Sequence, residues 1–149
     1  MRILVFIVLI VGAAFWVNSR IDLRGSYIKE NVPPASEFDK LLQRDLLEYF
    51  RSNGLPESDE VKASLLHDQP SQSGVADPKY YVWVQIYSAG KQLEQGAVKV
   101  AAIKKQKFYI MDYVTQAQIR NGSVQIENIF PSALLPRVRQ FADGVRNSK

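Results

Sequence analysis

The chain has 149 residues, of which 46% are apolar, so it has room for one domain of ordinary size with a substantial core. The net charge of +4 is small for 19 basic and 15 acidic residues, and their interspersion excludes the basic footprint of a nucleic-acid-binding protein. The absence of cysteine excludes disulfides, thiolate metal sites, thiol nucleophiles and a lipid-modified cysteine.

An unbroken apolar run at residues 3–17 is the strongest feature of the sequence. As a helix it reaches about 22 Å, which is short for a hydrocarbon core of about 30 Å but long for a secretion signal. Small residues ending at Ala14 permit cleavage there, whereas Phe15 and Trp16 extend the run and suit a membrane interface. We therefore expect residues 1–20 to form an uncleaved membrane anchor, with a cleaved signal or a buried core helix as the alternatives.

The basic residues that flank this run bear on its orientation. Arg2 precedes it, while Arg20, Arg24 and Lys29 follow it, and a literal count favours a cytoplasmic C-terminal part. A single-arginine head followed at once by a long apolar run is nevertheless typical of exported bacterial chains. We expect a single-pass protein of the bacterial inner membrane with its C-terminal domain in the periplasm.

Residues 21–35 predict a linker, because they mix charges and end near the Pro33–Pro34 pair. Residues 36–149 then predict a soluble α+β domain. Apolar residues at helical spacing predict its first helix over 37–52, with Ser36 as the N-cap residue.

Alternating and β-branched runs predict about four strands, the central one after Pro78. Three of the predicted strands cover residues 60–67, 80–87 and 108–114, with a surface loop at 68–78. A further strand follows the turn at residues 88–90 and ends in residues 97–103. Short connections between the last three indicate an antiparallel meander.

The chain after the meander predicts helices. Residues 116–120 indicate one helical turn, and 124–130 fit either a short helix or an extended run. Pro131 and Ser132 introduce a second helix, with apolar residues on one face.

The order of the predicted elements over Ser36 to Ala142 resembles the cystatin-like or nuclear-transport-factor-like layout. That order is helix, strand, loop, meander and helix. The resemblance implies a cupped sheet with a helix across it, which often serves as a binding or assembly module. It implies no chemistry.

Few residues in the chain could carry catalysis. His67 is the one histidine, and Asp68, Ser71 and Ser73 follow it without a motif that would position a triad. The acidic residues within 57–60 fit a solvated turn, and the glycines lack the spacing of a phosphate loop. We expect no enzymatic activity, no cofactor and no metal.

Four lysines gather around one predicted hairpin turn, where they could meet anionic lipid headgroups or an acidic partner. They are Lys99, Lys104, Lys105 and Lys107. Lysines at strand ends also keep sheet edges soluble, which is the simpler interpretation.

Aromatic residues share one face of the strand after Pro78, namely Tyr81, Trp83 and Tyr87, and the apolar residues share the other. If helices cover the apolar face alone, the aromatic face is open for contacts. If both faces are covered, Trp83 belongs to the core.

Together these features predict a non-enzymatic, membrane-anchored extracytoplasmic protein that is an interaction or assembly subunit of a cell-envelope complex. Its partners would be the membrane, through residues 3–17, and a protein of the envelope. The alternative is a stand-alone periplasmic module that binds a small hydrophobic or anionic ligand.

Overall fold

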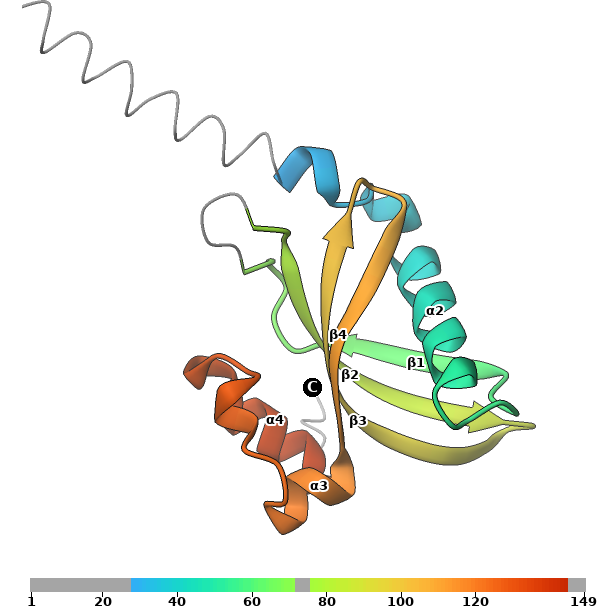
Figure 1. Ribbon diagram of the computed structural model, residues 1–149, viewed down its shortest axis with the longest axis vertical. Helices are drawn as coiled ribbons and strands as arrows, with labels where there is room; N and C mark the ends of the chain where they lie inside the picture. Colours follow the sequence, from blue (N-terminus) through green and yellow to red (C-terminus); the bar gives the residue numbers. More distant parts are fainter. Residues whose placement is uncertain (1–27, 72–75, 145–149) are drawn as a thin grey trace, which may run out of the picture.

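The computed structural model describes residues 28–71 and 76–144, which form one antiparallel sheet with helices on both faces (Figure 1). In chain order the elements are α2 (Ala35–Ser52), β1 (Glu60–Leu65), β2 (Lys79–Ser88), β3 (Lys91–Ile103), β4 (Lys107–Thr115), α3 (Gln116–Asn121), the 3₁₀ turns η1 (Ile126–Asn128) and η2 (Ser132–Leu134), and α4 (Leu135–Ala142). The strands lie in the order β1-β2-β3-β4, and all neighbours are antiparallel. The predicted α+β class with a four-stranded antiparallel sheet is confirmed.

Helix α2 begins directly after two prolines. Pro34 is the N-cap residue, with φ −56° and ψ 148°, and its carbonyl accepts the amides of Glu37 and Phe38 at 2.9 and 3.0 Å. The predicted N-cap, Ser36, lies inside the first turn, so this detail of the prediction is wrong. The proline ring already holds the extended backbone that a cap residue needs, and no side-chain cap forms.

One hydrophobic core lies between α2 and the sheet. Leu42, Leu46 and Phe50 of α2 are each at most 2% exposed, at the helical spacing that places them on one face. The sheet contributes one face of its two central strands: Tyr80, Val82, Val84, Ile86, Val98, Val100 and Ala102. Each fully buried Val or Leu contributes about 1.5–3 kcal/mol relative to exposure, so this layer holds α2 in place.

A second core lies on the opposite face, beneath the C-terminal part of the chain (Figure 1). Its buried members are Leu66, Tyr81, Trp83, Ala97, Val114, Ile126, Phe130, Leu134, Val138 and Ala142. The ambiguous residues 124–130 include η1, and the second predicted helix is present as α4, one 3₁₀ turn later than Ser132. Pro136 lies in the first turn of α4, where its missing N–H costs nothing.

Strand β4 leaves no room for a side chain at Gly96 of β3. A Cβ at this position would lie 2.2 Å from the Val114 carbonyl oxygen and 2.8 Å from Cε2 of Tyr113. Tyr113 in turn stacks edge to face on Phe50 of α2, with ring centroids 4.9 Å apart. Glycine at position 96 therefore leaves space for the Tyr113 ring, which joins β4 to α2.

The N-terminal part of the described chain packs against the domain. Residues 28–31 are helical, Asn31 and Pro33 are buried, and Val32 contacts the core under α2. Within the described ranges, no helix is long and apolar enough to cross a membrane. The predicted anchor at residues 1–20 and the linker up to residue 27 lie outside them.

Replacement of Gly96 by alanine should destabilise the domain by about 3 kcal/mol, because the added methyl meets backbone that cannot move aside. Urea unfolding followed by circular dichroism measures the loss. The control is Gly122→Ala, whose methyl would meet nothing within 4 Å and costs about 1 kcal/mol through its φ of +66°. Equal losses in the two variants would contradict the close approach.

Alkaline pH should destabilise the folded domain, because the folded state disfavours ionisation of the Tyr113 phenol. Burial, and secondarily the nearby negative charge of Glu94, raises the pKa of this phenol above its ordinary value of 10.0. Its contribution to stability is therefore complete below pH 10 and is lost as pH rises further, by up to about 1.4 kcal/mol per pH unit. In Tyr113→Phe, unfolding free energies measured from pH 9 to 12 should fall less steeply than in the wild type; parallel curves would contradict this.

Candidate interaction surface

The turn between β3 and β4 carries three exposed lysines, and we call residues 104–107 the lysine turn. Lys104 and Lys105 have φ angles of +50° and +59°, and the Gln106 amide donates to the Ile103 carbonyl at 3.1 Å. Two successive positive φ angles are the pattern of a type I′ turn, which favours Asn-Gly. Lysine at each position costs about 1 kcal/mol, so the turn is strained.

The end of the predicted linker holds this strained turn from one side. The amide of Lys104 donates to the Asn31 side-chain oxygen at 3.0 Å, and the amide of Lys105 donates to the Asn31 carbonyl at 2.8 Å. Asn31 is 6% exposed, so both bonds are shielded from water. The residues joined are 73 positions apart in the sequence.

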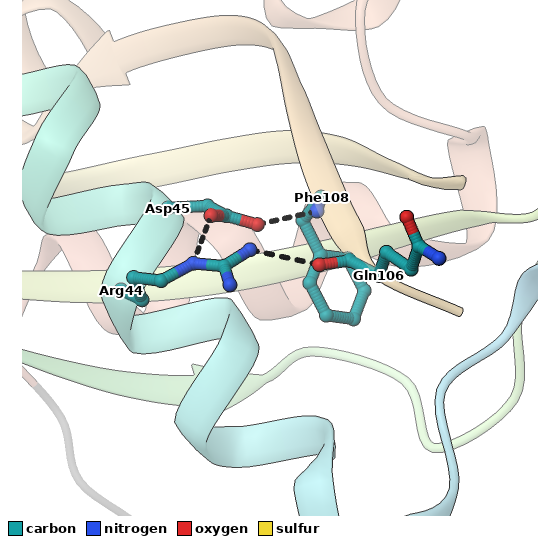
Figure 2. A network of polar contacts seen from close by, with 4 residues as sticks. All are labelled: Arg44, Asp45, Gln106 and Phe108. Atoms are coloured by element: carbon teal, nitrogen blue, oxygen red, sulfur yellow. Dashed lines mark hydrogen bonds and ion pairs between the residues drawn. The ribbon is translucent and has the colours of Figure 1, made fainter. Parts of the chain in front are cut away.

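Helix α2 holds the turn from the other side (Figure 2). Arg44 Nη2 donates to the Gln106 carbonyl at 2.8 Å, and Asp45 Oδ2 accepts the Phe108 amide at 2.6 Å. Arg44 Nε also donates to Asp45 Oδ1 at 2.8 Å, and this bond is the largest cause that raises the pKa of the guanidinium. Arg44 and Asp45, which are adjacent on α2, thus provide hydrogen-bond partners for one carbonyl and one amide of the hairpin backbone.

The lysine turn differs from the predicted cluster by one residue. Lys99 lies within β3, where its Nζ is 3.6 Å from Asp112 Oδ2. Lys104, Lys105 and Lys107 are exposed, and none of them forms an ion pair within the described part of the chain. The structure therefore brings three of the four lysines together as a rigid basic projection.

The fold buries two of the three residues of the predicted aromatic surface and leaves the third, Tyr87, partly exposed. Tyr81 and Trp83 are 6% and 4% exposed, because both sheet faces are covered and these rings pack in the second core. The Trp83 ring lies 5.6 Å from Phe141, and the Tyr81 ring lies 5.9 Å from Phe130. This is the second of the two sequence alternatives, in which Trp83 is a core residue.

Tyr87 is the predicted aromatic residue that keeps partial exposure. It lies near the β2–β3 turn, with Lys62 Nζ 4.6 Å from its ring centroid and its hydroxyl 3.4 Å from the Gln92 side chain. Tyr81, Trp83 and Tyr87 therefore do not form one accessible patch.

Two exposed hydrophobic residues on β4 were not identified from the sequence. Tyr109 is 60% exposed and Met111 is 40% exposed, on a strand at the edge of the sheet. Lys99 pairs with Asp112 and Val100 with Ile110, so Met111 forms a bulge that shifts the alternation along β4. A run such as Phe108-Tyr109-Ile110-Met111 gives no sign of a bulge, because every residue in it is apolar.

Of the residues considered for catalysis, His67, Asp68 and Ser71 are described, whereas Ser73 lies outside the described residues. His67 is exposed, and its Nδ1 lies 2.8 Å from the Gln69 carbonyl in a local turn. In the ranges that the structure covers, no three His, Cys, Asp or Glu residues gather as metal ligands. An open depression of about 500 Å³ between α2 and β1 is lined by Lys40, Arg44 and Lys62 but also by Asp59 and Glu60. Charges of both signs give it no preference for an anion.

No family model matches the chain, and no match was found among curated proteins or solved structures. Any functional conclusion therefore depends on the surface of this molecule.

The Asp45 side chain should be essential to the hairpin. In Asp45→Ala the Phe108 amide loses its acceptor in a partly buried position, and we expect a loss of about 2 kcal/mol in unfolding free energy. Thermal and urea unfolding measure it. Asp39→Ala, at an exposed position on the same helix, should stay within about 0.5 kcal/mol of the wild type. Similar losses in both would show that the hydrogen bond does not hold the hairpin.

Proposed function

We propose that this protein is a non-enzymatic, membrane-anchored extracytoplasmic protein that acts as an interaction or assembly subunit of a cell-envelope complex. Residues 3–17 would hold it in the bacterial inner membrane as a single pass, with the domain in the periplasm. The apolar run in the sequence supports the anchor, and the surface of the domain supports the interaction role.

The exposed pair Tyr109 and Met111 on β4 is the observation that carries the interaction role. Aromatic residues and methionine are enriched where proteins dock, and an edge strand offers unpaired backbone groups to a partner. Tyr109 lies opposite Ala101, which shares the face of Tyr81 and Trp83, beyond the part that the C-terminal helices cover. The docking surface would thus be the open continuation of the aromatic face.

A binding module for a small ligand is the weaker alternative. Both sheet faces are filled by hydrophobic cores, so a concavity between sheet and helix, which the cystatin-like or nuclear-transport-factor-like layout would offer, has side chains in it. The depression beside α2 is open to solvent and mixed in charge. A docking role uses the surfaces that the domain does expose.

Affinity purification of the full-length chain from detergent-solubilised membranes of its native host tests the proposal. Mass spectrometry should find an intact N-terminus and a stoichiometric partner. The double variant Tyr109→Ala/Met111→Ala should reduce recovery of that partner by at least about tenfold, because truncation of a central aromatic anchor typically costs 2 kcal/mol or more. The amount of partner recovered is compared between the wild type and the double variant, so that a loss can be assigned to this surface.

Tyr87→Ala is the matched control, since it removes a tyrosine from the other end of the sheet and should leave recovery unchanged. Loss of the partner in the control alone would place docking at that end. A protein that begins at Phe15 and purifies alone would overturn the anchor and favour a soluble ligand-binding domain.

A further inference from the structure

The lysine turn lies where the described chain begins. Asn31, which holds the turn, is three residues after Ile28, and the helical residues 28–31 lie beside the hairpin (Figure 1). Ten residues, 18–27, separate Ile28 from the end of the apolar run at Val17. Fully extended they reach about 40 Å, so a membrane that holds residues 3–17 lies within about that distance of Ile28, and Ile28 is at the same end of the domain as the lysine turn.

The charge of the lysine turn suits such a surface. Residues 104–107 contain three exposed lysines and no acidic residue. Two acidic side chains beside the hairpin have partners of their own, since Asp45 contacts Arg44 and the Phe108 amide, and Asp112 pairs with Lys99. The lysine charges are therefore directed outward rather than neutralised within the hairpin.

The backbone of the turn distinguishes a functional role from simple solubility. Lysines that only keep an edge soluble fit any exposed strand position, and they need neither positive φ angles nor bracing. Here two of the three occupy left-handed positions, held by Asn31, Arg44 and Asp45. Strain that several surrounding bonds maintain is typical of functional sites.

We propose that the lysine turn rests on the anionic lipid headgroups of the membrane that holds the N-terminal segment, and so fixes the orientation of the domain above the bilayer. This inference rests on the proposed function, because it requires the membrane anchor. One lysine near an anionic surface strengthens association by about fivefold. Two lysines should change the ratio of docked to undocked domain by about 30-fold.

The full-length chain in lipid vesicles provides the test. Because the sequence has no cysteine, Gln106→Cys accepts a single fluorophore at the exposed tip of the turn. Spin-labelled lipid headgroups should quench it in vesicles that contain phosphatidylglycerol and much less in phosphatidylcholine alone. Salt at about 1 M, where the Debye length is about 3 Å, should abolish the difference. Glu57→Cys, beyond the far end of α2, is the control label and should be quenched little in either.

Lys104→Asn/Lys105→Gly is the decisive variant, since it removes two charges and introduces the residues that a type I′ turn prefers. Its melting temperature should equal or exceed that of the wild type, while quenching at position 106 falls to the level in neutral vesicles. Equal quenching in neutral and anionic vesicles, or no effect of the variant, would overturn the lipid contact and leave the proposed function intact. Alkaline carbonate extraction tests the anchor itself. If it removes the full-length chain from the vesicles, both the anchor and the lipid contact are overturned.

Discussion

Burial of both faces of β2 is the constraint on which the other elements depend. Successive side chains of a strand point to opposite faces, so Val82 and Val84 enter the core under α2 while Trp83 enters the core under α4. Neither helix lies against the other's core, and each is needed to keep water from one side of the same strand. The edge strand β4 keeps exposed hydrophobic side chains, which form the proposed interaction surface.

The β3–β4 hairpin shows how the fold maintains a conformation that its own sequence disfavours. Two lysines in the left-handed region would relax in an isolated hairpin, because nothing local offsets the steric cost. Asn31 supplies acceptors on one side of the turn. On the other side, the Arg44–Asp45 pair supplies a donor and an acceptor (Figure 2). The projection is rigid because parts of the chain far apart in sequence converge on it, so its basic charge has a defined direction.

The proposed role of this domain rests on its exposed surface. Two hydrophobic cores occupy the interior on either side of the sheet, and the exposed His67 makes a local turn contact with the Gln69 carbonyl. The exposed features of β4 and of the lysine turn lie on one hairpin, whose tip contacts residues just after the N-terminal segment. A membrane contact and a protein contact on adjacent parts of one hairpin would let the membrane orient the docking strand.

The sequence by itself determined the class of the fold, the order of its elements and most of their boundaries, because helical spacing, β-branched runs and turn residues act over a few positions. Only the tertiary structure decided which faces are covered. Tyr81 and Trp83 are buried because the chain after Asn121 returns across the sheet, and alternation within β2 carries no record of that return. The bracing of Lys104 by Asn31 likewise depends on a contact across 73 residues. A periodic apolar pattern shows that a face is buried, but it does not show which distant segment covers that face.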